Sequence, residues 1–309
     1  MTALLPMPAP AGSTAIALPT PAHIARDLSY AHSASTPAGR LMIRTVENLT
    51  GRMALIRRAQ GYDRAVAQGA DFWREMMARY GLTLDLLGGS FDDVPTTGPL
   101  VMIANHPYGI LDGLVMGYVL AGLRGDFRIM AHAVFRKAPD VARVILPIDF
   151  AGTAQAQRAN IAMRGEAMEY LRHGGAVGVF PGGTVSTAAR PFDAPMDPAW
   201  RSFTAKMIAR TGATVVPVWF EGENSRLFQL ASHLHASLRM ALLLREFRAR
   251  LDRPVRLVVG QPIPAARLAT FGTDAKAMMD FLRRSTYELD PTGRDASRYG
   301  YEFEAHHKR

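Results

Sequence analysis

The stretch LVMIANHPYGILDGLVMGYVLAGLRG, residues 100–125, decides the fold of this chain. It begins with an uninterrupted apolar run, which is typical of a strand covered on both faces. A constrained turn with Asn105, His106 and Pro107 follows, and the residues from Asp112 onward have a helical composition. A buried strand that passes through a tight turn into a helix is the building unit of an α/β protein.

The same alternation continues along the chain. Strands are predicted at 82–88, 100–105, 127–135, 176–180, 214–220 and 254–263, and a short helix running into a strand at 141–149. Helices are predicted at 40–60, 63–81, 112–125, 160–175, 200–212, 226–250 and 274–289. We therefore predict the α/β fold class, with a mostly parallel or mixed sheet and helices on both faces.

The chain divides into four predicted parts. Residues 1–35 are rich in proline and alanine and nearly uncharged, which predicts a flexible leader without the basic start of a signal peptide. Residues 36–80 form a predicted N-terminal helical extension, residues 81–290 a single main domain, and residues 291–309 a polar C-terminal tail.

Composition and charge narrow the possible partners. With 48% hydrophobic and 20% charged residues, the chain has the composition of a globular protein with a sizeable core. No cysteine is present, which excludes disulfides and thiolate metal sites. The net charge of +9 favours anionic partners: nucleic acid, acidic metabolites or a membrane surface. The basic residues lack the pattern of a nucleic-acid reader, and no stretch approaches the roughly 18 apolar residues that span a bilayer.

His106 and Asp112 suggest a catalytic base and the group that orients it. A carboxylate beside one ring nitrogen fixes the tautomer and stabilises the imidazolium formed when the other nitrogen takes a proton. There is no G-x-S-x-G elbow and no cysteine, so the hydroxyl to be activated would belong to the substrate. The alternative is that His106 merely ends a strand and Asp112 caps the next helix.

Three motifs occur in order: ANHPYGILDGL (104–114), FPGGTVST (180–187) and VVPVWFEGENS (215–225). They resemble the lysophosphatidate acyltransferase-like superfamily of glycerolipid acyltransferases. Within it they are most similar to the bacterial branch labelled as hemolysins, which includes lyso-ornithine-lipid and other aminolipid acyltransferases. The resemblance covers roughly residues 80 to 265. It implies transfer of a fatty acyl group from an acyl carrier protein or coenzyme A thioester to a hydroxyl of a lyso-lipid. It also implies that His106 is the base and Asp112 its orienting partner.

Two departures from the superfamily pattern bear on the substrate. Five residues separate His106 from Asp112, where most members have four. Gly182 and Val185 stand where the common motif has a glutamate and an arginine associated with the acceptor's phosphate. Because phosphate recognition relies on arginine, this loss argues against a lysophosphatidate-like acceptor.

The resemblance and the residue types give a set of candidate substrate-binding residues. Donors to the acceptor or to the thioester oxygen are expected in the 180–187 loop, unless that loop is a plain strand-to-helix turn. The strand around Pro217 would line the acyl pocket, Asn224 would bind substrate or cap a helix, and Arg158 would bind an acidic headgroup or lie on the surface. The candidates are Asn105, Gly182, Gly183, Thr184, Ser186, Pro217, Asn224 and Arg158.

Residues 226–253 form the predicted membrane-contacting helix, with the 41–60 segment as the alternative. The 226–253 segment holds six arginines against two acidic residues, with leucines between them, although such helices also pack inward. His233 and His235 are two positions apart and do not share a helix face, so no metal site is predicted.

The sequence thus predicts a peripheral O-acyltransferase at the cytoplasmic face of the inner membrane, acting on a lyso-aminolipid such as lyso-ornithine lipid. No metal or cofactor is expected beyond the acyl thioester co-substrate. The alternatives are a lysophosphatidate-type phospholipid acyltransferase, a lipid hydrolase in which the same base activates water, and a non-catalytic membrane-binding protein.

Overall fold

The computed structural model describes residues 29–34, 36–133, 135, 139–149 and 153–302. Most of the predicted leader lies outside these ranges. Its last residues lie within them. Ser29 and Tyr30 are buried, and both donate hydrogen bonds to Glu47, which ties η1 (Tyr30–Ser33) to the helix that contains Glu47. The described chain is therefore anchored to the core from Ser29 onward.

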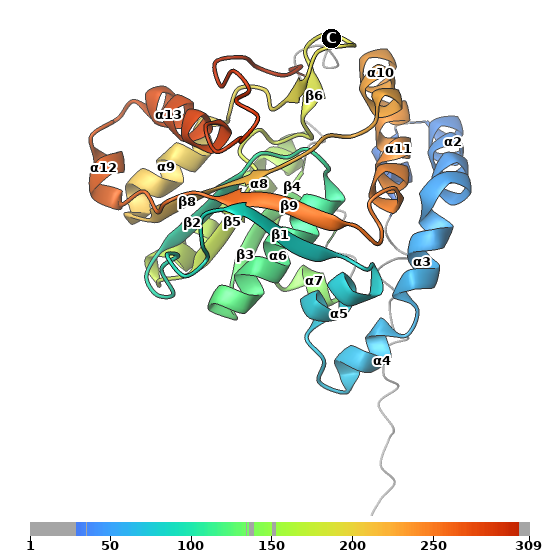
Figure 1. Cartoon of the computed structure of the whole chain (residues 1–309), viewed down its shortest axis with the longest axis horizontal. Helices are drawn as coiled ribbons and strands as arrows, with labels where there is room; N and C mark the ends of the chain where they lie inside the picture. Colours follow the sequence, from blue (N-terminus) through green and yellow to red (C-terminus); the bar gives the residue numbers. More distant parts are fainter. Residues whose placement is uncertain (1–28, 35, 134, 136–138, 150–152, 303–309) are drawn as a thin grey trace, which may run out of the picture.

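A seven-stranded mixed sheet forms the centre of the molecule (Figure 1). Its strands are β1 (Thr83–Gly88), β2 (Leu100–Ala104), β3 (Arg128–His132), β4 (Ile145–Ile148), β5 (Ala176–Val179), β8 (Thr214–Phe220) and β9 (Pro254–Val259). They are arranged in the order β1-β9-β8-β2-β5-β3-β4. The five strands from β8 to β4 run parallel, whereas β9 is antiparallel to β8, and β1 runs parallel to β9. A separate antiparallel pair consists of β6 (Thr187–Ala188) and β7 (Pro195–Met196). The predicted mostly parallel or mixed sheet is confirmed.

Helices cover both faces of this sheet, and β2 shows why. Leu100, Met102 and Ala104 enter one hydrophobic cluster, and Val101 and Ile103 enter the other, so every side chain of the strand is buried. An uninterrupted apolar run is what a strand between two layers requires. The helices are α2 (Pro37–Glu47), the π-helical turn η2 (Asn48–Arg52), α3 (Met53–Ala59), α4 (Tyr62–Ala67), α5 (Phe72–Arg79), α6 (Ile110–Arg124), α7 (Pro139–Ala142), α8 (Ala154–Arg172), α9 (Ser202–Thr211), α10 (Arg226–Leu234), α11 (Ala236–Arg248), α12 (Ala265–Ala269) and α13 (Ala275–Tyr287).

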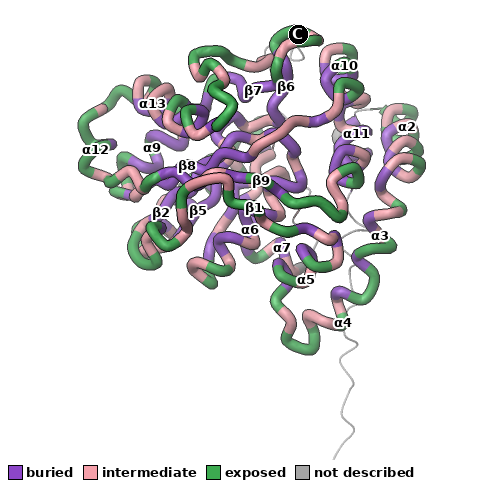
Figure 2. The backbone as a smooth tube through the Cα atoms, viewed as in Figure 1, coloured by how far each residue is buried: buried purple, intermediate pink, exposed green. Residues whose placement is uncertain are grey.

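Two segments that were predicted as single helices are each divided into two helices in the structure. The 63–81 segment is broken into α4 and α5 around Gly69, whose φ is 98°, and Asp71 caps the second helix. The 226–250 segment is broken at His235, which is extended and accepts the N–H of Ser237. Helix α12 was not predicted. Figure 2 shows buried residues along the central strands and exposed ones along the outer side of the molecule.

The N-terminal helices share their core with the rest of the chain. Ile43, Leu55 and Trp73 belong to the same hydrophobic cluster as strand β2, and α2 packs along α11. Gly117 of α6 lies directly against the Trp73 ring, where a Cβ would come within 2.1 Å. The predicted extension of residues 36–80 is thus joined to the main domain by buried contacts.

Candidate active site

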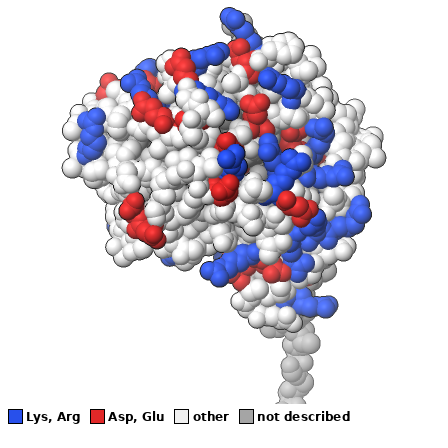
Figure 3. Space-filling model, viewed as in Figure 1, with Lys and Arg blue, Asp and Glu red and all other residues white. Residues whose placement is uncertain are grey.

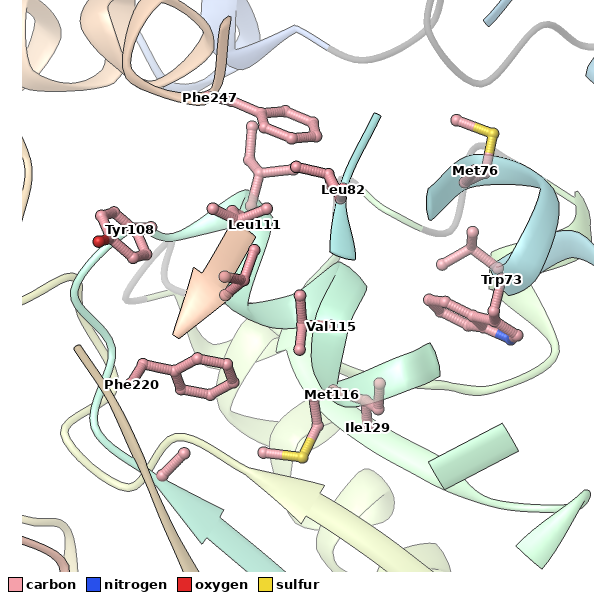
Figure 4. Packing of buried hydrophobic residues seen from close by; sticks show 14 of the residues in the cluster. Trp73, Met76, Leu82, Tyr108, Leu111, Val115, Met116, Ile129, Phe220 and Phe247 are labelled. Carbon is pink, nitrogen blue, oxygen red and sulfur yellow. The ribbon is translucent and has the colours of Figure 1, made fainter. Parts of the chain in front are cut away.

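A cavity of about 440 Å³ lies at the carboxyl ends of β2, β3 and β5, beside helices α5, α6 and α11. This volume is within the range of pockets that bind small molecules. Most lining residues are apolar or aromatic, including Trp73, Met76, Ile129 and Phe247, which Figure 4 shows within the surrounding core. Burial lowers the pKa of His132 on the wall, which disfavours a positive charge there. The cavity suits a long apolar ligand.

His106 and Asp112 meet at this cavity. Nδ1 of His106 lies 3.0 Å from Oδ2 of Asp112, although the ring is turned out of line for a hydrogen bond. The Asp112 side chain is fully buried, whereas 18% of the His106 side chain is exposed. Because Asp112 faces Nδ1, Nε2 is the nitrogen left for a substrate. The pair has the composition of a general base with its charge partner.

Asp112 also holds the turn before α6. Its Oδ2 accepts the backbone N–H groups of Tyr108 at 2.8 Å and Gly109 at 2.9 Å. Gly109 has a φ of 86°, which side chains of L-residues rarely adopt. The five-residue spacing is therefore absorbed at this glycine. The capping role that the sequence allowed for Asp112 is present together with the contact to His106.

Asp197 fixes the main chain of His106. Its buried carboxylate accepts the N–H of His106 at 3.2 Å and hydrogen bonds from the side chains of Ser186 and Trp200. The N–H of Ser186 in turn donates to the carbonyl of His106 at 2.8 Å. Burial raises the pKa of the Asp197 carboxyl, and the bonds from Ser186 and Trp200 oppose that shift. His106 is thus positioned from its backbone as well as from its ring.

The aromatic ring of Phe180 supports the histidine from the other side of the site. Phe180 follows β5, and its ring stacks on the His106 ring with centroids 4.2 Å apart. The motif after β5 and the motif after β2 are therefore brought into direct contact. Parallel strands whose carboxyl ends meet at one edge of a sheet account for this meeting.

Three predicted site residues line the cavity: His106, Gly183 and Thr184. Asp112 lies directly behind His106. Gly182 packs against Asp197, where a Cβ would come within 3.3 Å. Ser186 was predicted as a donor to substrate, but its hydroxyl is buried and donates to Asp197. Ser186 thus helps to hold Asp197 and, through it, the backbone of His106.

The remaining predicted site residues lie away from the cavity. Asn105 exchanges two hydrogen bonds with the backbone of Phe220 and ties the ends of β2 and β8. Pro217 is buried within β8 and does not line this cavity. Asn224 is buried beside α10, whose cap is Ser225. Arg158 lies on the exposed face of α8.

Sequence reasoning missed three polar residues of this region: Asp197, Arg201 and Arg239. Arg201 runs beside Gly183 and pairs with Glu302 at 2.9 Å, and Arg239 lines the cavity from α11. No motif marks them, because each is one polar residue in an ordinary loop or helix.

Comparisons with known proteins found a family and individual proteins to which this chain is similar. The family model described as Acyltransferase matches residues 68–296. The chain is 26% identical over 229 residues to the Lyso-glycine lipid O-acyltransferase of Phocaeicola vulgatus, covering 72% of this chain and 78% of that protein. It also matches the crystal structure of the 1-acyl-sn-glycerophosphate acyltransferase from Thermotoga maritima with 18% identity and a TM-score of 0.43, over 81% of this chain and 93% of that one.

Proposed function

The chain belongs to the acyltransferase family, and we propose that it transfers a fatty acyl group from a thioester to a hydroxyl of a lyso-aminolipid. One observation carries this proposal: His106, backed by a buried Asp112, lies at the mainly apolar cavity. The cavity would hold the acyl chain and bring its thioester carbonyl to the base. A lyso-lipid supplies the hydroxyl that attacks it.

The reaction follows from these positions. Nε2 of His106 takes the proton of the acceptor hydroxyl while the oxygen attacks the thioester carbonyl carbon. A tetrahedral oxyanion forms, the carbon–sulfur bond breaks, and the proton passes from His106 to the departing thiolate. The charge of Asp112 stabilises the imidazolium between these two transfers. The products are an ester and the free thiol of an acyl carrier protein or coenzyme A.

The loop after β5 supports an aminolipid acceptor. Val185 is 7% exposed and lines the cavity, so this position offers no charge to a phosphate monoester. Arg201, which runs beside Gly183, is the better candidate than Arg158 for an acidic headgroup. The name of the Phocaeicola relative, which specifies a lyso-glycine lipid, points to the same class of acceptor. Whether the headgroup is ornithine or another amino acid is part of the test.

A transfer assay with purified protein tests the proposal. An acyl-carrier-protein or coenzyme A thioester is supplied with lyso-ornithine lipid, lyso-glycine lipid or lysophosphatidate, and the acylated product is measured. We expect transfer to the two aminolipids. Transfer to lysophosphatidate alone would correct the acceptor, free fatty acid without acceptor would indicate a hydrolase, and no turnover with any substrate would refute the proposal.

Gly113 should set the length of the acyl chain that fits. It lies in α6 on the cavity wall, and a Cβ there meets nothing within 4 Å. We expect Gly113→Leu to fill this space and shift the preference from long-chain to medium-chain donors by about tenfold, from competition assays. Gly122→Leu is the matched control, because Gly122 is on the same helix, also faces open space and is exposed. Equal shifts in both variants would contradict the assignment.

We also propose that the enzyme is peripheral and docks on an anionic membrane through α2, η2 and α3, at the cytoplasmic face of the inner membrane. Leu41, Leu49 and Met53, which we name the outer stripe, are 69%, 78% and 46% exposed. The opposite face of the same helices is buried against α11. Figure 3 shows basic side chains gathered on this side of the molecule, and those of α2, η2 and α3 are all arginines. Among the described residues, no helix has the length and apolar content to cross a bilayer.

Within the predicted membrane segment 226–253, α10 leaves Leu227, Leu230 and Leu234 49%, 40% and 75% exposed, so this half remains the alternative docking surface. The second half of that segment, α11, buries Leu242, Leu243 and Phe247 in the core, so it packs inward. Exposed apolar side chains beside arginines give both the hydrophobic and the electrostatic part of interfacial binding. Insertion of the outer stripe into a membrane would bury apolar side chains that remain exposed in the folded protein.

Replacing the outer stripe with glutamine should weaken membrane binding. Each of Leu41, Leu49 and Met53 would lose about 1.5–3 kcal/mol of apolar burial if fully inserted, so a fall of at least about 100-fold is expected in vesicle co-sedimentation. Ile161→Gln on α8 is the control, because Ile161 is 66% exposed outside this surface. Parent-like binding by the triple variant would rule out this docking face.

A further inference from the structure

We propose that Arg239 orients the hydroxyl of Thr184 so that Thr184 donates a hydrogen bond to the oxyanion of the reaction. This inference rests on the proposed function and names the donor within it. Thr184 lies in the loop after β5, Arg239 lies in α11, and both line the cavity with His106. The two elements come together only in the folded chain.

The guanidinium of Arg239 binds the loop after β5 through hydrogen bonds. Nη2 donates to Thr184 Oγ1 at 2.9 Å and to the carbonyl of Val185 at 2.7 Å. Nη1 donates to Thr187 Oγ1 and to Ser232 Oγ. The side chain is 3% exposed and lies 5.0 Å from the ring centroid of Phe228. A charged group buried at a cavity is retained against a desolvation cost, which calls for a functional reason.

Hydrogen-bond directions identify the donor. A guanidinium has only donors, so each hydroxyl that it contacts must accept and keeps its own proton for another partner. Thr187 donates its proton to the carbonyl of Val185, and Ser232 donates to the carbonyl of Phe228. Ser186 donates to Asp197. Among the described residues, no acceptor is found for the Thr184 hydroxyl, which is therefore left to donate into the cavity.

The positive charge strengthens this donor. A hydroxyl that accepts from a cation is polarised and becomes a better donor in turn. Burial lowers the pKa of Arg239 to about 9, so the guanidinium stays charged at neutral pH. Val185 stands where the resembling superfamily has an arginine. The guanidinium of Arg239 reaches the same loop from α11, but its Nη groups donate within the protein and are not offered to a phosphate. Fixed donors aimed at developing negative charge stabilise the transition state more than the bound substrate.

Matched threonine variants test the inference. We expect Thr184→Val to lower kcat about 100-fold, with the Michaelis constants of both substrates and the Kd of an unreactive thioether analogue of the acyl donor within about twofold of the parent values. Thr184→Ser keeps the hydroxyl and should recover most of the rate. Thr187→Val is the control: it removes a hydroxyl bound to the same guanidinium but outside the cavity wall, and should lower the Tm without a comparable loss of kcat.

Arg239 is tested by a double-mutant cycle. Arg239→Gln should lower kcat in the parent background but cause little further loss in the Thr184→Val background, because both changes remove one donor. If Arg239→Gln does not fold, the threonine variants alone test the inference. Parent-like kcat in Thr184→Val, or an equal loss in Thr187→Val, would overturn the inference while leaving the acyltransferase proposal intact. If the parent itself transfers no acyl group, both proposals fail.

Discussion

Alanine in place of His106 is expected to lower kcat for acyl transfer by about 10³-fold while the protein stays folded. The loss corresponds to removing the general base that takes the acceptor proton and returns it to the thiolate. The backbone bonds of His106 to Asp197 and Ser186 do not involve the ring and should remain in the variant. Initial rates at saturating donor and acceptor measure the effect.

Two controls separate chemistry from folding in this variant. Its Tm should remain within a few degrees of the parent value, because the missing ring is partly exposed and its stacking on Phe180 is one contact among many. Added imidazole should restore part of the rate by entering the vacated space. An unchanged rate in His106→Ala would mean that another group is the base, and the proposed mechanism would have to be abandoned.

Asparagine in place of Asp112 should give the second largest loss, about 10²- to 10³-fold in kcat, from the range for positioned acid–base groups. One amide oxygen can still accept the N–H groups of Tyr108 and Gly109, so the turn is preserved. The amide nitrogen would occupy the position of Oδ1, which has no hydrogen-bond partner among the described residues. What is lost is the negative charge 3.0 Å from Nδ1 of His106.

The comparison with Asp112→Ala separates the two roles of this side chain. Alanine removes both the charge and the cap, so it should lower the rate and also the stability, by about 0.5–2 kcal/mol for the lost cap. Asp112→Asn should lower the rate with a smaller change in the urea midpoint. If Asp112→Asn keeps the parent rate and only Asp112→Ala fails, then the aspartate acts as a helix cap alone.

The sequence predicted those features whose signal is local. Strand β2, the turn with His106 and Asp112, and helix α6 lie within 25 residues of one another, and their pattern is visible without knowing any partner. The breaks at Gly69 and His235 were missed for different reasons. Gly69 lies within an otherwise helical composition, and His235 is an ordinary residue that has an extended backbone and caps α11 with its side chain.

Contacts between residues that are far apart in the sequence could not be predicted from the sequence. Asp197 is 91 positions from His106, and Arg239 is 55 positions from Thr184. Both are common residue types whose role depends on the loop they face after folding. The same limit applies to Ser186 and Pro217: their places in the motifs are visible in the sequence, but the direction of a side chain is set by its neighbours in space.

The hydrogen bonds that the carbonyl of Asp197 accepts determine when the site can form during synthesis of the chain. It accepts hydrogen bonds from the N–H of Gly300 and from Arg283, while Tyr30 near the start of the described chain forms part of the cavity wall. His106 and Asp112 are synthesised early, but Asp197, which holds the backbone of His106, is held in turn by a segment made much later. Folding of this site therefore waits on contacts of long sequence separation, which form slowly. A ribosome-bound chain that ends before Gly300 should hold neither His106 nor the loop after β5 in its final place, so activity should begin only once this segment has left the ribosome.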